Sequence, residues 1–426
     1  MIMQKFYRLA AVASVSLCSL AGIAPSAHAY ETVSGGRYGQ VTVTKPTGDV
    51  RGFVVLFSKE SGWNPADQQA ADALAKNGAM VVGVDTEKYA ANLAAKKEAC
   101  HQLVGDAEAV SHQLERQVKS DRYFMPILAG SGQGATLSMQ VLKQAAENTV
   151  AGAVSVAAQR DLDKRFNPCP PDPTITHGPG LPGFAETDAN ASAGTQRIVD
   201  LTTPHLRAAA MKEEDVSDLP LIELPAAHPN GLMAIVISGD GGWRDLDKTI
   251  AEELQKDGVS VIGWDSLRYF WSEKSPAQTS KDLARVIQTY GARWHANRIA
   301  LIGYSFGADV MPFAYNRLPD ALRAKVSLIS LLGFAPSADF QVRVTGWLGM
   351  PASDKALKVQ PELAKVPPSI VQCVYGADEK DTLCPALANT GIDLVKTNGS
   401  HHFDGDYSAL AAKIIEGWKK EIAARG

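Results

Sequence analysis

The run Ile299-Ala300-Leu301-Ile302-Gly303-Tyr304-Ser305-Phe306-Gly307-Ala308 decides how the rest of the chain is interpreted. Four apolar residues lead into Gly-x-Ser-x-Gly, a pattern typical of a nucleophile elbow, in which a serine stands at the tip of a sharp turn between a buried strand and a helix. Gly303 and Gly307 would leave room for the neighbouring strand and helix. The turn would expose the Ser305 hydroxyl and direct the Phe306 N–H at a developing oxyanion.

A five-residue pattern of this kind also arises by chance in a chain with 36 glycines. The catalytic interpretation therefore depends on its context. A helix-capable run follows the motif at 308–318, and the fold requires an acid and a histidine further along, in the order Ser, Asp, His.

The acid and the histidine are expected in the loops after two later strands. An aspartate four residues before Pro385 favours Asp381 over Asp378 as the acid, although both could be solvated loop carboxylates. His401 is predicted as the general base, with His402 as the alternative. A surface pair or a metal site is the other reading of these histidines, but no third ligand has suitable spacing, so we expect no metal and no cofactor.

The second oxyanion donor should come from the glycine-rich loop after the first core strand of this half. The N–H of Gly239 or Asp240 is our choice, because glycine-rich backbone can approach a ligand closely. We assign Asp240 and Trp243 to substrate binding. The segment Phe334–Pro368 is either a lid or substrate wall of the site or a plain surface insertion.

The N-terminus has the composition of a secretory signal peptide. Lys5 and Arg8 precede an apolar run, and Ala27-His28-Ala29 fits a small-x-small cleavage site, which predicts a mature chain from Tyr30. An uncleaved membrane anchor is the alternative, although the apolar run is short for a span. We therefore expect a periplasmic protein that has lost residues 1–29.

Four cysteines remain after removal of the signal peptide. An even number in an exported chain predicts disulfides, and one pair per half gives Cys100–Cys169 and Cys373–Cys384. Unpaired buried thiols are the alternative. The formal charge of -4 and the lack of a basic block argue against a nucleic-acid partner.

The two halves of the chain repeat one pattern. Trp63 follows a buried strand in the first half, and Trp243 follows one 180 positions later; Asp85 and Asp265 are separated by the same interval. Strands alternate with helices in both halves, which predicts parallel sheets covered on both faces. The chain is thus expected to form two tandem α/β-hydrolase-like domains that arose by duplication.

The first half has lost its nucleophile. In Gly130-Ser131-Gly132-Gln133-Gly134 the elbow spacing is kept, but Gly132 stands where Ser305 stands in the second half, and Ser131 is one position early. No plausible acid and histidine follow in this half. We predict a degenerate, non-catalytic domain over 30–206, a polar linker over 207–218 and a catalytic domain over 219–426.

Three motifs of the second half resemble the AcvB/VirJ family of exported bacterial proteins: Ser-Gly-Asp-Gly-Gly-Trp-Arg-Asp-Leu-Asp at 238–247, Gly-Tyr-Ser-Phe-Gly-Ala-Asp at 303–309, and His-His-Phe-Asp-Gly-Asp-Tyr at 401–407. The degenerate first half resembles the long form of that family. The resemblance implies a periplasmic serine hydrolase that cleaves aminoacylated phosphatidylglycerol, lysyl-phosphatidylglycerol above all. It also implies peripheral contact with the inner membrane and an association with virulence and secretion-system proteins.

A lysyl ester would also suit the charges of the predicted site. Asp240, Asp309, Asp404 and Asp406 lie in or beside the segments that form it and could receive the two ammonium groups. Asp404 and Asp406 could equally cap the last helix. The alternative function is a periplasmic binding or chaperone component of a secretion system, with an inherited but idle elbow.

Overall fold

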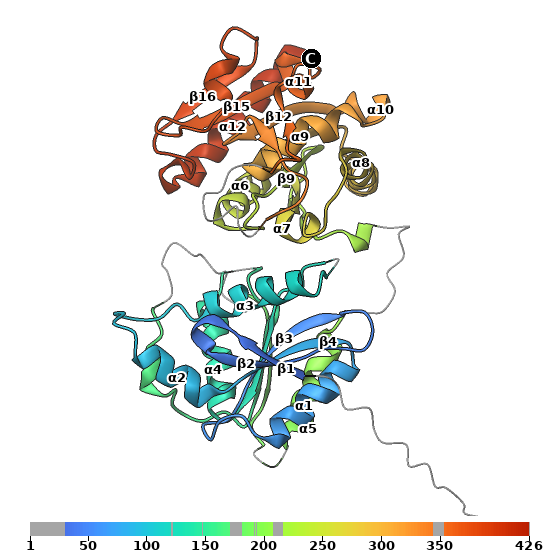
Figure 1. Ribbon diagram of the computed structural model, residues 1–426. Coiled ribbons are helices and arrows are strands. Elements are labelled where there is room, and N and C mark those ends of the chain that lie inside the picture. The colour runs from blue at the N-terminus through green and yellow to red at the C-terminus, as the bar shows by residue number, and fades with distance from the viewer. Residues whose placement is uncertain are drawn as a thin grey trace, which may run out of the picture.

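The computed structural model describes residues 30–120, 122–146, 148–170, 181–190, 192, 194–207, 216–343 and 353–425. The predicted signal peptide, most of the predicted linker and residues 344–352 of the lid candidate lie outside these ranges. The described residues form two α/β domains, one beside the other (Figure 1). None of the described helices combines the length and the apolar composition needed to cross a bilayer.

The first domain is built on a seven-stranded sheet in the order β1-β2-β4-β3-β5-β6-β7. β2 pairs antiparallel with β1 and with β4, and all other neighbours are parallel. The strands are β1 (Tyr30–Ser34), β2 (Gln40–Thr44), β3 (Gly52–Phe57), β4 (Ala79–Val84), β5 (Ile127–Ser131), β6 (Gly152–Val156) and β7 (Phe184–Asp188). Helices α2 (Thr86–Ala94), α3 (Val104–Gln117) and α4 (Gln133–Gln144) pack on one face, and α1 (Pro65–Lys76) and α5 (Gly194–Thr202) pack on the other.

The second domain contains another seven-stranded sheet, in the order β16-β15-β12-β11-β9-β10-β8. Within this sheet, β8 pairs antiparallel with β10, and all other neighbours are parallel. The strands are β8 (Leu221–Leu224), β9 (Leu232–Ile237), β10 (Ser260–Trp264), β11 (Arg298–Tyr304), β12 (Val326–Leu332), β15 (Val371–Gly376) and β16 (Asp393–Thr397). Helices α8 (Pro276–Arg293) and α9 (Phe306–Asn316) cover one face, and α6 (Asp245–Lys256) and α12 (Tyr407–Arg425) cover the other.

Shorter elements complete the second domain. The helices α7 (Ser266–Tyr269), α10 (Asp320–Arg323) and α11 (Gln360–Leu363) connect its strands. Within the lid candidate, β13 (Ser337–Ala338) and β14 (Leu357–Lys358) pair antiparallel. This segment therefore has some structure of its own, and its role as a lid stays a prediction.

The two sheets share one topology, as the internal repeat predicts. Without β1 and β16, both follow the same strand order, with β5 in the first sheet equivalent to β11 in the second. The predicted fold of two tandem α/β domains is confirmed. Among the described residues the first sheet has no equivalent of β16, the strand that precedes His401.

Each half also contains one disulfide. Cys100 is joined to Cys169 and Cys373 to Cys384, which confirms the predicted pairing. Cys373 lies within β15, so the second bridge ties the loop after that strand back to the sheet. This loop carries the carboxylates that were predicted to serve the histidine.

The domains meet through a polar and aromatic contact. The Arg116 guanidinium of α3 lies 3.6 Å from the ring centre of Trp271 and donates to the carbonyl oxygens of Trp271 and Val342. Tyr123 of the first domain also packs on that ring, at 4.9 Å between ring centres. The contact places the first domain against the carboxyl edge of the second sheet, the edge where ligands bind in open α/β folds.

Candidate active site

Ser305 occupies a strained turn between β11 and α9. Its backbone has φ 51° and ψ -117°, a combination that residues other than glycine rarely adopt. Its N–H donates to Leu332 O at 2.8 Å, which fixes the turn against β12. A Cβ atom at Gly307 would lie 2.2 Å from Ile237 O, so only glycine allows α9 to start this close to β9. The elbow predicted from the sequence is present.

The first domain keeps the same turn without a serine. Gly132 has φ 57° and ψ -124°, close to the angles of Ser305. Ser131 is 3% exposed, and its hydroxyl forms no hydrogen bond within the described chain. Gly132 therefore takes the place of the nucleophile, and Ser131 is turned into the protein.

His401 has a carboxylate partner that the sequence analysis did not select. Its Nδ1 lies 2.6 Å from Glu379 Oε1, and the Glu379 side chain is only 6% exposed. This contact leaves Nε2 as the nitrogen able to accept a proton. His402 instead points its Nδ1 at the Tyr304 hydroxyl, 3.1 Å away. Of the two histidines, the structure brings His401 to an acid.

The assignment of Asp381 as the partner of the histidine is therefore corrected to Glu379. Both Asp381 and its alternative Asp378 are exposed to solvent. The loop turns back at once after β15, with Glu379 N–H donating to Gly376 O at 3.2 Å and Glu379 Oε2 accepting from Gly376 N–H at 3.3 Å. That turn directs the side chain of Glu379 inward and those of its two neighbouring aspartates outward.

Two residues next to Ser305 hold the His401 ring. The Tyr304 ring packs on it, with 5.2 Å between ring centres, and the Tyr304 hydroxyl donates to His401 O at 3.3 Å. Gly333 follows Leu332, whose carbonyl accepts the Ser305 N–H. There is no room for a side chain at Gly333, because a Cβ there would lie 2.6 Å from His401 Cε1. The histidine is thus packed beside the elbow.

The predicted oxyanion loop also reaches the elbow. A Cβ at Gly239 would lie 3.2 Å from the Tyr304 ring and 3.7 Å from Ser305 Cβ, so the backbone of Gly239 lies beside the elbow. Phe306 is the first residue of α9, where no preceding carbonyl of the helix accepts its N–H. The role of the N–H groups of Phe306 and of Gly239 or Asp240 as oxyanion donors stays a prediction.

Trp243 does not lie in the site, which corrects its assignment to substrate binding. Its side chain is 2% exposed, and its ring fills the space left by Gly263, where a Cβ would lie 2.5 Å from the ring. Trp63 occupies the same position over Gly83 in the first domain. The tryptophan packs against the core in both copies, buried in the second domain and partly buried in the first.

Several carboxylates surround the elbow. Desolvation of the half-buried Asp309 carboxyl raises its pKa well above the ordinary value, and the nearby negative charges of Asp240, Glu379 and Asp339 raise it further. Asp309 Oδ1 accepts the Ala335 N–H at 2.8 Å, so this residue also holds the loop after β12. Asp406 accepts the N–H of Ala409 and caps α12, one of the two roles considered for it.

Arg244 links the oxyanion loop to the first domain. Its Nε donates to Gly241 O at 2.9 Å, within the loop, while its two terminal nitrogens reach Thr149 Oγ1 at 2.6 Å and Glu108 Oε1 at 2.7 Å across the domain boundary. The sequence analysis missed this role, because the partners lie in the other half of the chain. The Arg244 guanidinium therefore ties the oxyanion loop of the second domain to the first domain.

Residues 51–158 and 231–422 match the family model described as "Bacterial virulence protein (VirJ)". No curated protein sequence matches the chain. Among solved structures, Est1E from Butyrivibrio proteoclasticus with ferulic acid bound is similar at 15% identity and a TM-score of 0.35, over 49% of this chain and 98% of that one. A serine hydrolase without a lid from Xanthomonas campestris is similar at 15% identity and a TM-score of 0.33, over 50% of this chain and 97% of that one.

Proposed function

The chain belongs to the bacterial virulence protein family VirJ, and we propose that it is a periplasmic serine hydrolase that cleaves the aminoacyl ester of aminoacylated phosphatidylglycerol. The observation that carries the proposal is the strained Ser305 turn packed against a histidine that is bonded to a buried carboxylate. The two disulfides fit an oxidising compartment such as the periplasm.

The proposed reaction is acyl transfer to serine. Ser305 attacks the ester carbonyl, His401 Nε2 takes its proton, and Glu379 stabilises the imidazolium that forms. The N–H groups of Phe306 and Gly239 stabilise the oxyanion. The imidazolium then protonates the leaving glycerol oxygen of the lipid, and water releases the amino acid from the serine by the same steps.

The charges around the elbow support a cationic acyl group, lysine above all. Asp240 and Asp309 are close enough for the charge of one to disfavour ionisation of the other. An ammonium group placed between them would relieve this repulsion, whereas an unpaired ammonium in a partly dry site is unfavourable by several kcal/mol. Asp240 is the better candidate for contact with substrate, because its loop borders the nucleophile: a Cβ on the preceding Gly239 would lie 3.7 Å from Ser305 Cβ.

The test uses purified mature protein and vesicles that contain lysyl-phosphatidylglycerol, with free lysine measured by mass spectrometry. The wild type should release lysine and react with a fluorophosphonate probe, and Ser305→Ala should do neither while its thermal unfolding stays unchanged. A folded wild type that neither reacts with the probe nor hydrolyses any ester would refute the proposal. That result would favour a binding component of a secretion system.

Substrate choice is tested separately with Asp240→Asn. This variant keeps the backbone and the side-chain volume, so it should lose about tenfold on the lysyl lipid and little on a neutral p-nitrophenyl ester. An equal loss on both substrates would show that Asp240 shapes the oxyanion loop and does not recognise charge.

A further inference from the structure

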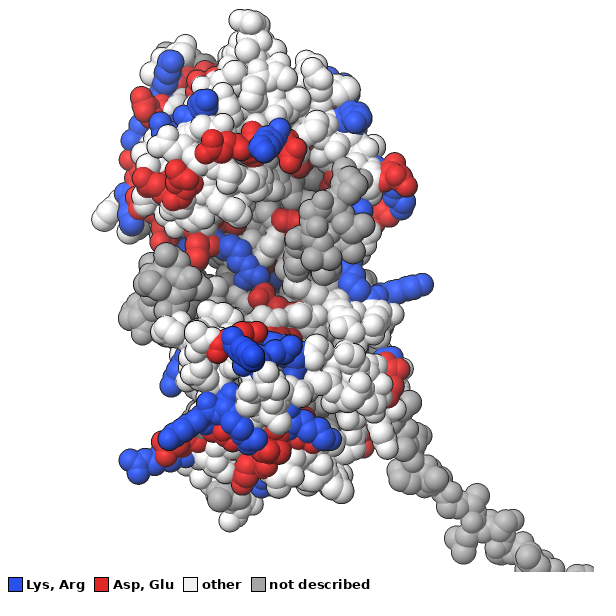
Figure 2. Space-filling model, turned by 60° about the vertical axis from the view of Figure 1, so that its left-hand side comes forward, with Lys and Arg blue, Asp and Glu red and all other residues white. Residues whose placement is uncertain are grey.

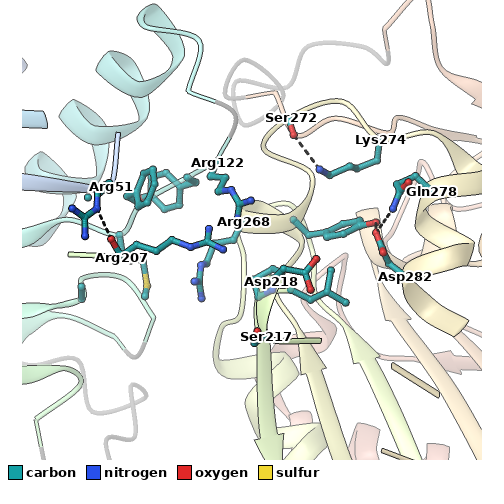
Figure 3. Close-up of a pocket in the computed structure, with 18 of the residues that line it drawn as sticks. Arg51, Arg122, Arg207, Ser217, Asp218, Arg268, Ser272, Lys274, Gln278 and Asp282 are labelled. Carbon is teal, nitrogen blue, oxygen red and sulfur yellow. Dashed lines mark hydrogen bonds between the residues drawn. The ribbon is translucent and has the colours of Figure 1, made fainter. Parts of the chain in front are cut away.

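A cavity of about 920 Å³ lies between the two domains, outside the site described above. Neither Ser305 nor His401 lines it. Its walls come from the amino ends of strands in the first domain and from α7, α8 and the segment before β8 in the second (Figure 3). Its volume is within the range of pockets that hold small organic ligands.

The lining of this cavity is strongly basic. Among the described residues it carries seven Lys and Arg side chains but only three Asp and Glu side chains. The basic residues are Arg51, Arg122, Arg207, Arg268, Lys274, Lys281 and Arg285. Figure 3 shows Arg122, Arg207 and Arg268 extending into the same space from three segments. Figure 2 shows basic side chains in the hollow between the domains.

The acidic residues of the lining are already engaged. Asp218 and Asp282 both bind Arg285, at 2.6 Å and 3.0 Å, and Glu273 binds Lys355, which does not line the cavity. Within the described part of the chain, Arg268 and Lys281 form no ion pair. Among the residues that the structure describes, Arg51 donates to the backbone oxygens of Arg207 and Asn77 and to no carboxylate. The cavity thus retains an excess of positive charge.

Positive charges gathered in one concave space repel one another and attract an anion. We propose that this interdomain cavity is a binding site for a phosphate-bearing anion, held by arginines of both domains. Phosphate suits the arrangement better than a carboxylate does, because the guanidinium groups approach from several directions. A tetrahedral phosphate presents acceptor oxygens on all sides, whereas a carboxylate presents two in one plane.

The cavity is close to the candidate active site without being part of it. Tyr269 lines the cavity, and the ring of the next residue, Phe270, packs on Phe306 at 4.9 Å between ring centres. Phe306 directly follows Ser305. A bound phosphate could belong to a lipid head group or to a free anion, and the experiment separates these sources.

Binding is measured in the Ser305→Ala protein, so the outcome does not depend on hydrolysis. Calorimetric titration uses inorganic phosphate and glycerophosphoglycerol, and flotation uses vesicles of phosphatidylglycerol or of phosphatidylcholine. Binding of the soluble phosphates without preference for either vesicle would identify a free anion, and preference for phosphatidylglycerol vesicles would identify the lipid head group. Absence of binding in every arm, at low ionic strength where charge attraction is strongest, would overturn the proposal.

Variants then locate the site. Arg268→Gln should weaken phosphate binding about tenfold or more, and the exposed Lys281→Gln should weaken it without affecting folding. The matched control is Arg293→Gln, because Arg293 lies on the same helix as Lys281 but pairs with Glu223 at 3.1 Å and does not line the cavity. Equal affinity of Arg268→Gln, Lys281→Gln and the control would place any binding elsewhere and refute the assignment.

Discussion

Replacement of Glu379 by glutamine tests the arrangement on which the proposed mechanism depends. The His401 Nδ1 to Glu379 Oε1 distance is 2.6 Å, and unit charges at that separation attract by about 6 kcal/mol at an effective dielectric of 20. Because the histidine side chain is 39% exposed, solvent screening reduces this value to about 4 kcal/mol. The attraction exists only while the imidazolium exists, so Glu379→Gln should lower kcat by about 10³-fold and change KM little.

The assay is the turnover of a short-chain p-nitrophenyl ester, with thermal unfolding recorded for every variant. Asp381→Asn and Asp378→Asn are matched controls on the same loop, and both should stay within about twofold of the wild type because these side chains are exposed. A loss of about 10³-fold in Asp381→Asn together with an active Glu379→Gln would refute the reasoning. The acid would then be the aspartate that the sequence favoured.

Three further predictions concern the two domains. Arg244→Gln should lower kcat for the neutral ester at least tenfold with little change in KM, because the substitution releases the oxyanion loop. Glu108→Gln should have the same effect, since it removes a partner of Arg244. The double variant should lower kcat no more than the more damaging single variant does. Ser131→Ala should leave ester turnover within about twofold, because its hydroxyl is buried away from the site; a large loss in the folded variant would show that the first domain takes part in catalysis. Burial and the charges of two nearby arginines lower the pKa of His112 to about 4. The neutral histidine therefore contributes to the free energy of unfolding in full above pH 6.5, and this contribution should fall by about 3 kcal/mol as the pH drops to 4. Denaturant unfolding should show this loss in the wild type but not in His112→Phe.

The parts of the fold that repeat could be predicted from the sequence, because each half of the chain can be compared with the other. Ser305 and Gly132 stand at equal positions in two copies of one pattern, and the structure gives them nearly the same backbone angles. The same comparison would have corrected the assignment of Trp243 to substrate binding. Trp63 stands in the same place in the copy that lacks the nucleophile, which indicates packing and not chemistry.

The acid could not be chosen from the sequence, because three carboxylates lie within four residues of one another on the loop after β15. Which of them points inward depends on the turn closed between Glu379 N–H and Gly376 O. The basic cavity is less predictable still. Its charges come from segments spread between Arg51 and Arg285, and only the packing of the two domains brings them together.

The paired turns have a consequence for the stability of the first domain. A serine in the backbone conformation of Ser305 raises the free energy of the folded chain by about 1 to 3 kcal/mol, whereas glycine at the same angles is almost free of that strain. Glycine at position 132 therefore leaves this turn with less strain than the equivalent turn at Ser305. Gly132→Ser should therefore lower the stability of the first domain, and we expect no turnover from it, because none of the described strands of this half is equivalent to β16, which precedes His401. The same turn therefore carries a backbone strain in the second domain, where its serine is the proposed nucleophile, and almost none in the first, where glycine stands at the tip.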